Sequence, residues 1–468
     1  MTAPVLLWLR RELRLADNPA LAAALASGRP VLPVYVLDET TPGTCAPGGA
    51  SRWWLHHSLA ALTAALARAG APLVLRRGPL AQVLPDLVRE TKAVAMHAGQ
   101  PFEPWARAAT ADLERAAGVP LHLHRTTTLF DPAAIRTQAG APYSVFTPFA
   151  RACRAHAPLA PPLPAPAHIP APPPPASDRL QAWNLLPTRP DWADGLRDTW
   201  TPGEAGAQAR LATFTAAALA AYDHARDRPG TDGTSMLSPH LAFGEVSARQ
   251  LWHAAGAGPG VARWTDELLW REFSAHLLWH HPTLPEAPLR PAFRRMPWRH
   301  DPAALRAWQR GRTGLPIVDA GMRQLWQTGW MHNRVRMIAA SLLVKHLLLP
   351  WQDGAAWFWD TLVDADLASN AASWQWVAGS GADAAPYFRI FNPVLQGQKF
   401  DPDGTYVRRF LPELAALPDR WVHAPWTAPA AVLAQAGVRI GHSTPAPIVD
   451  LAAGRARALA AFAALAAS

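Results

Sequence analysis

The sequence predicts an α/β N-terminal domain with a parallel five-stranded, Rossmann-like sheet, joined by a long proline-rich linker to an all-α C-terminal domain. Three observations predict this: short apolar runs alternate with helical segments over the first 130 residues, proline is dense at 155–177, and strand patterns fade beyond about residue 200. Alternating strands and helices are typical of a parallel sheet covered on both faces. The expected domains are therefore 1–130, a linker at 131–199, and 200–468.

Five apolar runs are the expected strands of the first domain. They lie at residues 5–9, 31–37, 73–75, 94–96 and 121–123. Segments between them, such as 51–68 and 79–90, have the apolar spacing of helices. The motif G-x-G-x-x-G does not follow the first run, so this is not the usual dinucleotide-binding domain.

The remaining chain is expected to be linker and then helices. Residues 155–177 contain too much proline for a helix or a sheet ladder and should be extended. Helical segments are expected at 207–225, 247–255, 264–279, 302–310, 319–327, 331–348 and 357–362.

Composition indicates a globular protein, with 50% hydrophobic and 17% charged residues. No run of about 18 apolar residues without charge or proline predicts a membrane span. The opening run MTAPVLLWLRRELRL favours a buried strand over a secretory signal. The two cysteines, Cys45 and Cys153, cannot form a disulfide framework or a metal site, so we expect no metal and a cytoplasmic location.

Charge and tryptophan content give the first functional hints. The chain carries 44 Lys+Arg against 35 Asp+Glu, a formal charge of +9, and this balance favours a polyanionic partner. The alternative is a composition bias from a GC-rich genome. The 22 tryptophans are mostly core residues, although indole is also a stacking surface for bases and is readily oxidised.

One candidate motif for cofactor binding runs from Thr234 to Ser238. Ser238, followed by Pro239, is a predicted N-cap and first-turn pair. Hydroxyls and free backbone N–H groups at a helix start suit phosphate. An ordinary capped helix is the alternative interpretation.

Two further segments combine polar and aromatic residues on a predicted helix face. Glu267, Trp270 and Arg271 share one face and could hold a flat polar heterocycle, or could form a salt bridge with packed tryptophan. Asn333 and Arg336 share another face with Met337, whereas Arg334 points elsewhere and would suit a phosphate contact.

The segment 364–376 has the densest set of candidate site residues. Asp364 and Asp366 lie near a probable helix start, and Asn370 follows Asp366 by four positions. Trp374 and Trp376 are two residues apart and therefore point in different directions. One could face a cofactor and the other an external ligand.

Jointly, these motifs resemble those of the cryptochrome/photolyase family. D-G-T-S-x-L-S, E-L-x-W-R-E-F, W-M-H-N-R-x-R-M, D-x-D-x-A-x-N, W-Q-W and Y-F-R-I-F-N-P occur in the family's order and spacing, after an opening W-L-R-R-E-L-R and D-N-P. The resemblance covers about residues 4–465. W-M-H-N-R-x-R-M with W-Q-W is similar to the microbial class I cyclobutane-dimer photolyases, whereas six-four and DASH relatives differ in this segment.

The resemblance implies an N-terminal antenna domain and a helical FAD-binding domain. It also implies light-dependent repair of cyclobutane pyrimidine dimers, by electron transfer from excited reduced FAD to a flipped-out dimer, as in a deoxyribodipyrimidine photo-lyase. The implied partner is UV-damaged DNA, bound by a monomer that associates with the nucleoid. A cryptochrome-like blue-light photoreceptor and a six-four photolyase are the alternatives, the latter disfavoured by Asn333, where those enzymes tend to carry histidine.

Roles for individual residues follow from the same resemblance. FAD contacts would come from Tyr222, Thr234, Ser235, Met236, Leu237, Ser238, Arg271, Arg336, Asp364, Asp366 and Asn370. Glu267, Trp270, Met337 and Trp376 would meet the flipped dimer, with Asn333 between flavin and dimer. Arg226, Arg334, Arg389 and Lys399 would hold phosphates of the damaged strand.

The family also implies a row of tryptophans and an antenna site. Trp374, Trp351 and Trp298 match the row that carries electrons between flavin and surface. In relatives with a folate antenna an Asn-Glu pair follows the Tyr-Glu of this region, whereas here Phe102-Glu103-Pro104 is followed by Trp105-Ala106. A second chromophore is therefore possible but a folate is disfavoured, and a deazaflavin, an FMN or an empty site remain open.

Overall fold

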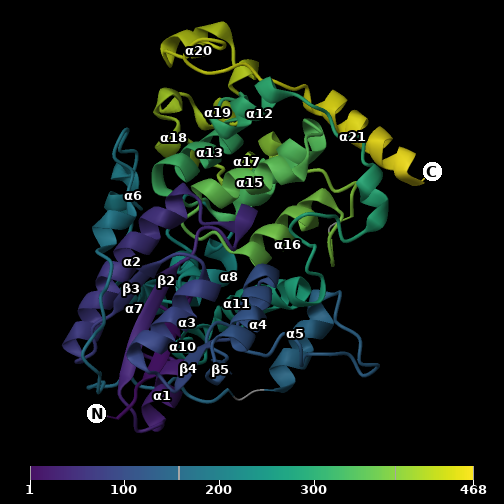
Figure 1. Ribbon diagram of the computed structural model, residues 1–468. Helices are drawn as coiled ribbons and strands as arrows, with labels where there is room; N and C mark the ends of the chain where they lie inside the picture. Colours follow the sequence, from purple (N-terminus) through teal and green to yellow (C-terminus); the bar gives the residue numbers. More distant parts are fainter. Residues whose placement is uncertain (1, 157–158, 385, 467–468) are drawn as a thin grey trace. The chain divides into compact units, whose positions relative to one another are not determined.

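A computed structural model of the chain describes residues 2–156, 159–384 and 386–466 (Figure 1). Residues 157–158 of the predicted proline-rich stretch lie outside the described residues. The chain divides into two compact units: the first comprises Met1–Ala220, Ser235–Pro282 and Val363–Ser369, and the second comprises Ala221–Thr234, Thr283–Leu362 and Asn370–Ser468. The boundaries at 130 and 200 stay a prediction, because these units are discontinuous in sequence.

The first unit contains the predicted five-stranded parallel sheet, which is confirmed. The strands are β1 Val5–Leu9, β2 Val31–Leu37, β3 Val74–Arg77, β4 Ala95–Gly99 and β5 Leu121–His124, in the order β3-β2-β1-β4-β5. Val5 in the central strand is in register with Val31 on one side and Ala95 on the other. β3 extends beyond the predicted 73–75 because Arg76 and Arg77 continue the pairing with β2 after the apolar run has ended.

Helices cover both faces of this sheet, as alternating side chains require (Figure 1). On one face Val5, Leu7 and Leu9 share a core with α1 (Pro19–Ala26) and α2 (Gly49–Arg68). On the other face Leu6 and Trp8 share a core with α3 (Leu80–Thr91) and α4 (Pro104–Ala116). The central strand is therefore buried on both sides, and the loop that follows it begins with Arg10 and Arg11.

The rest of the first unit is helical and irregular. Its further elements are α5 Phe146–Ala155, η2 Leu180–Trp183, α6 Asp194–Thr199, α7 Glu204–Ala217, α9 Ser238–Ala242, α10 Ala248–Ala254 and α11 Val261–His280. The single helix predicted at 207–225 is instead α7, η3 (Leu219–Ala221) and α8 (Tyr222–Ala225). The break falls at Ala218, which has φ −117°, inside an alanine-rich run with no residue that marks a helix end.

The second unit is largely helical, which confirms the predicted class of the C-terminal region. Its elements are α8, η4 Pro291–Arg295, α12 Pro302–Gln309, α13 Pro316–Thr328, α14 Asn333–Ser341, η5 Leu342–His346, α15 Trp351–Thr361, α16 Leu367–Ala378, α17 Pro393–Phe400, α18 Thr405–Phe410, η6 Pro412–Leu414, α19 Asp419–Val422, η7 Pro425–Thr427, α20 Ala430–Gln435 and α21 Leu451–Ala466. The first residues of α16 belong to the first unit.

Two of these helices differ most from their predicted bounds. The helix expected at 331–348 is α14 followed by the π-helical turn η5, which holds the buried Lys345. The Lys345 ammonium donates to the Tyr387 carbonyl at 3.1 Å and lies 3.3 Å from the centroid of the Tyr387 ring. α15 begins at Trp351, directly after Pro350, six residues before the predicted start. No helix among the described residues is long and apolar enough to cross a membrane.

Candidate functional site

The predicted site residues fall into two sets, one in each compact unit. The first unit contains Ser235, Met236, Leu237, Ser238, Glu267, Trp270, Arg271, Asp364 and Asp366, and the second contains Tyr222, Arg226, Thr234, Trp298, Asn333, Arg334, Arg336, Met337, Trp351, Asn370, Trp374, Trp376, Arg389 and Lys399.

Asp366 is held at the start of α16 by two separate contacts. Its Oδ1 accepts a hydrogen bond from the Ser369 N–H at 2.9 Å, and its Oδ2 lies 2.7 Å from Nη2 of Arg11. Burial acts to raise the pKa of Asp366, but the charges of Arg11 and Arg271 and the hydrogen bonds outweigh it, so the pKa lies below its ordinary value. Asp366, which lies directly before α16 as predicted, is therefore a fixed, ionised acceptor.

The Thr234–Ser238 segment has an unusual backbone. Met236 has φ +50°, in the left-handed region that side chains rarely adopt, and Ser235 Oγ accepts from the Leu237 N–H at 3.4 Å. The prediction that Ser238 is the N-cap is wrong: α9 begins at Ser238, and Leu237 is its cap residue. The helix starts one residue earlier because Pro239 fits its second position as well as its first.

A glycine before this segment is required by close packing. A Cβ on Gly233 would lie 2.6 Å from the Ala225 Cβ of α8. The loop that leads into Thr234 is therefore pressed against α8, which carries the buried Tyr222.

Glu267, Trp270 and Arg271 are all half-buried on α11, which agrees with their predicted common face. One face of Trp270 is covered, because the Phe146 ring stacks on it with centroids 3.7 Å apart at 6°. Arg271 Nη1 donates to the Thr127 carbonyl at 2.7 Å. The face of Trp270 that Phe146 covers is therefore not available to a ligand.

Glu272, next to Arg271, is a buried carboxylate that the sequence analysis did not single out. Its Oε2 accepts from the N–H groups of Leu129 at 2.8 Å and Phe130 at 3.1 Å. Burial raises the pKa of Glu272 to about 7, against the charge of Arg271 and these hydrogen bonds. It ties the backbone at 129–130 to α11.

At the start of α14, Arg334 is ion-paired, which the sequence did not reveal. Its Nη2 lies 2.7 Å from Asp227 Oδ1, and its guanidinium lies 4.4 Å from the Phe400 ring centroid. Arg226 Nε lies 3.9 Å from the same Asp227 oxygen. Two of the four predicted phosphate contacts therefore share one carboxylate.

The neighbours of Arg334 in this segment are fixed by local hydrogen bonds. Asn333 is the first residue of α14, and His332 caps it by accepting from the Arg334 N–H at Nδ1 (3.2 Å). Burial lowers the pKa of His332 to about 4, so this imidazole is neutral. Arg336 Nε donates to the Met331 carbonyl at 2.7 Å, and Met337 Sδ lies 4.0 Å from Arg334 Nη1.

The two other predicted phosphate contacts are exposed. Lys399 is near the end of α17, and Arg389 lies in the segment before that helix. Both side chains are accessible to a polyanion.

α16 presents its two tryptophans differently, as predicted from their spacing. Trp374 is buried, whereas Trp376 is half-buried. Asn370, also half-buried, donates from Nδ2 to the Ala355 carbonyl at 3.1 Å, which orients its amide.

Trp374 lies in an aromatic cluster that includes α15. Its ring centroid is 5.1 Å from Phe358 and 6.2 Å from Trp308. A Cβ on Gly354 would lie 2.1 Å from Trp374 Cη2, so the indole rests directly on α15, one turn after Trp351.

The three tryptophans of the predicted electron-transfer row differ in burial as a path from flavin to surface requires. Trp374 and Trp351 are buried, and Trp298 is half-buried beside the core cluster that contains Phe293 and Met296. This order suits a path from an interior group towards solvent.

The residues that sequence reasoning missed have weak sequence signals. Arg11 follows another arginine, and Asp227 lies between two arginines. Glu272 and His332 lie inside motifs that were noted for their neighbours. For Arg11 one signal existed: polar residues directly after a buried parallel strand lie at the carboxyl edge of the sheet, where ligands bind.

Comparison with known proteins gives matches along nearly the whole chain. A family profile described as DNA photolyase matches residues 5–169, and one described as FAD binding domain of DNA photolyase matches residues 264–464. A deoxyribodipyrimidine photo-lyase of Agrobacterium fabrum is 50% identical, over 99% of this chain and 98% of the relative. Cryptochrome-1 of Arabidopsis thaliana is 38% identical, over 97% of this chain and 69% of the relative.

A solved structure is similar throughout. The crystal structure of a bacterial class III photolyase from Agrobacterium tumefaciens has a TM-score of 0.97 and 49% identity, covering 100% of this chain and 98% of that one. With its parallel α/β domain, its helical FAD-binding region and these full-length matches, the chain belongs to the cryptochrome/photolyase family.

Proposed function

We propose that this protein is a deoxyribodipyrimidine photo-lyase that repairs cyclobutane pyrimidine dimers in UV-damaged DNA under light. The observation that carries the proposal is the 50% identity, over 99% of the chain, to a protein of that name. Net chemistry is the splitting of the dimer with no overall oxidation or reduction, so no nicotinamide site is needed.

The residues present suit a flavin. Asp366 offers a fixed carboxylate, Asn370 an oriented amide, and Arg271 and Arg336 offer cationic donors. The segment from Thr234 adds hydroxyls and a turned backbone. With Tyr222, Ser235, Met236, Leu237, Ser238 and Asp364, these are the residues that would hold FAD. When bound and reduced, FAD supplies an electron to the dimer on excitation.

The dimer must leave the helix stack to be reached, so the protein needs a pocket with aromatic walls. We assign Trp376 and Trp270 as walls, with Met337 beside them and Asn333 between the flavin and the dimer. Glu267 would hydrogen-bond to the thymine carbonyls and stabilise negative charge that develops there.

The phosphates flanking the dimer would be held by Arg226, Arg334, Arg389 and Lys399. Because Arg226 and Arg334 share Asp227, phosphate must compete with a carboxylate at these two, whereas Arg389 and Lys399 are exposed. The tryptophans Trp374, Trp351 and Trp298 would pass an electron inward to restore the reduced cofactor.

For the subclass, we infer class III in place of the class I that the motifs suggested. The support is the 49% identity and TM-score of 0.97 to a protein described as class III. A second chromophore remains possible, and the expectation that it is not a folate stays a prediction. Glu103, in the segment on which that prediction rests, is engaged by Arg11.

The test is to illuminate purified, reduced protein with an oligonucleotide that contains one thymine dimer and to measure recovered thymine. Repair that requires light supports the proposal. FAD binding and a light response without repair would instead identify a photoreceptor, a possibility kept open by the 38% identity to cryptochrome-1. Repair of six-four photoproducts but not of cyclobutane dimers would also contradict it. A monomeric state and a cytoplasmic location remain predictions, to be checked by light scattering and fractionation.

A further inference from the structure

Arg11 follows β1 directly and contacts three segments of the first unit. Its Nε donates to the Ala242 carbonyl at 2.9 Å, its Nη2 lies 2.7 Å from Asp366 Oδ2, and its Nη1 pairs with Glu103 at the start of α4. All three edges of the guanidinium are therefore in use, a pattern that lysine cannot reproduce.

We propose that Arg11 is a positioning residue for the flavin, which fixes the Asp366 carboxylate and the helix that follows the Thr234–Ser238 segment. This inference rests on the proposed function, because it takes Asp366 and Thr234–Ser238 as flavin contacts. Arg11 itself lies in the N-terminal α/β region, and the proposal assigns it no contact with the cofactor.

The buried Asp366 carboxylate needs compensating charge to stay ionised. The residue is only 9% exposed, and a carboxylate this buried takes up a proton unless charges and donors compensate. The groups that face it are Arg11, Arg271 and the Ser369 N–H, and Glu103 acts on it through Arg11. Arg11 is the only one of these cations in direct contact with Asp366 among the contacts described above.

The backbone at Arg11 also packs against the segment after α9. Gly244 has φ +66°, and a Cβ there would lie 1.8 Å from the Arg11 carbonyl oxygen. The Leu13 N–H donates to the Phe243 carbonyl at 3.2 Å. α9 begins at Ser238 and ends at Ala242. Because Arg11 donates to the Ala242 carbonyl and pairs with Asp366, one side chain contacts both this helix and the carboxylate.

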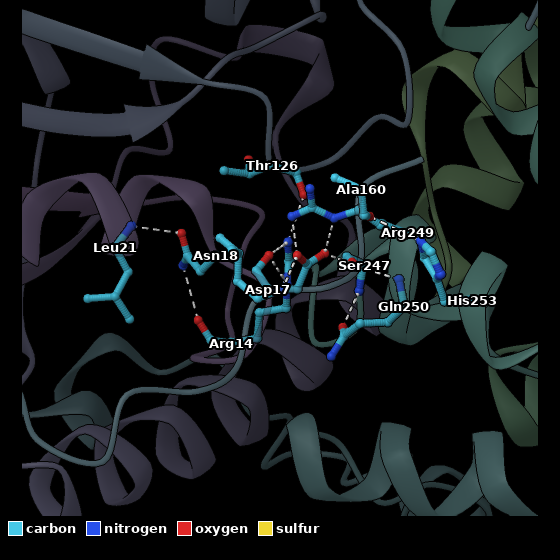
Figure 2. A network of polar contacts seen from close by, with 11 residues as sticks. Arg14, Asp17, Asn18, Leu21, Thr126, Ala160, Ser247, Arg249, Gln250 and His253 are labelled. Carbon is cyan, nitrogen blue, oxygen red and sulfur yellow. Dashed lines mark hydrogen bonds and ion pairs between the residues drawn. The ribbon is translucent and has the colours of Figure 1, made fainter. Parts of the chain in front are cut away.

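A matched control exists in the same unit (Figure 2). Arg249 pairs with the buried Asp17, with Nε 3.1 Å from Oδ2, and this pair belongs to a network that includes Ser247. The Arg249 side chain is 24% exposed and that of Arg11 is 27% exposed. The Arg249 pair contains no proposed flavin residue, so its loss reports only the general effect of breaking such an ion pair.

The experiment compares Arg11→Gln and Arg249→Gln holoproteins with the parent. FAD release after dilution is followed by flavin fluorescence between pH 5 and pH 8.5. We expect Arg11→Gln to release FAD about tenfold faster or more at pH 7, which corresponds to about 1.4 kcal/mol. Arg249→Gln should release it within a factor of about two of the parent rate.

The pH profile separates positioning from a structural role. In Arg11→Gln, Asp366 loses its nearest cation, so the pKa of Asp366 rises. The excess release rate, which is the FAD release rate of the variant above that of the parent, should therefore change over the pH range in which Asp366 takes up a proton. Adding Asp366→Asn to Arg11→Gln should remove that pH dependence. If Arg11→Gln does not fold, Arg11→Lys is compared with Arg249→Lys and should still release FAD faster, because lysine cannot keep all three contacts.

Equal release rates in the Arg11 and Arg249 variants, or a pH-independent excess rate, would overturn the inference. A parent protein that holds no FAD would overturn the proposed function itself. If the parent holds FAD and repairs dimers but the Arg11 variant retains FAD as well as the parent does, only the proposed role of Arg11 is wrong.

Discussion

Gly354 on α15 offers a way to move one tryptophan without replacing it. Gly354→Ala adds a Cβ that would lie 2.1 Å from Cη2 and 2.6 Å from Cζ3 of Trp374, and 2.7 Å from Cδ2 of Leu343. Carbon atoms in contact are normally about 3.5–4.0 Å apart, so the indole must move by more than about 1 Å.

The surroundings determine what this movement costs. Trp374 is enclosed by Phe358 and Trp308, and Trp308 is itself fixed by a hydrogen bond from Nε1 to the Ala339 carbonyl at 3.0 Å. Overpacking a core costs about 1–3 kcal/mol, whereas alanine gains about 1 kcal/mol over glycine in a helix interior. We expect a net loss of about 0–2 kcal/mol in the free energy of unfolding, so the variant should fold.

The functional effect should exceed the effect on stability. A displacement of about 1 Å can cost on the order of 100-fold where geometry controls a rate. Light-driven reduction of the bound flavin by an external reductant should therefore be at least tenfold slower in Gly354→Ala. Protein reduced chemically beforehand should repair dimers at close to the parent rate.

The control is Gly454→Ala in α21, where the nearest atoms to an added Cβ are all 3.1 Å away and belong to His346. It should photoreduce at the parent rate. If Gly354→Ala also photoreduces at the parent rate while unfolding data show a normally folded protein, the assignment of Trp374 as the first electron donor is wrong.

Further predictions concern the row, the DNA contacts and a buried amine. Trp298→Phe should slow photoreduction while chemically reduced protein still repairs dimers; an unchanged rate would mean that another tryptophan is the exit. Arg334→Ala and Lys399→Ala should weaken binding to damaged duplex and reduce the slope of log affinity against log salt by about 0.9 each, measured by fluorescence anisotropy. Trp376→Ala should reduce the preference for damaged over intact DNA, since stacking is worth about 1–3 kcal/mol per base, and an unchanged ratio would count against its role. Burial lowers the pKa of Lys345 to about 7, so between pH 7 and 10.5 the unfolded chain binds more protons than the folded chain, and the free energy of unfolding should rise with pH. Urea titrations should show that Lys345→Met loses this rise, and an equal dependence of stability on pH in parent and variant would contradict the prediction.

The sequence predicted the sheet well because its central strands, such as β1 and β2, are buried on both faces and appear as short apolar runs. Their far ends were less predictable, since Arg76 and Arg77 continue β3 through backbone pairing alone. The break at Ala218 escaped notice because an alanine-rich run looks the same inside a helix and at its end.

Among the candidate site residues, the placement of sequence neighbours on one helix was predictable, as for Glu267 and Trp270 on α11. Contacts were not predictable where the partner is distant in sequence. Arg11 and Asp366 are 355 positions apart, and the covering of Trp270 by Phe146 likewise joins different helices. Such contacts depend on tertiary packing, which leaves no periodic pattern in either segment.

The discontinuity of the first compact unit has a consequence for how the protein is made. Its last segment is Val363–Ser369, so on the ribosome this unit lacks a part until most of the chain has been synthesised. At about 5–20 residues per second, the segment Val363–Ser369, which carries Asp366, is synthesised many seconds after the sheet and its helices. During that interval Arg11 and the polar edge after β1 lack this partner. The same discontinuity means that cutting the gene after the α/β region, or after Pro282, removes part of the first unit rather than separating two independent halves.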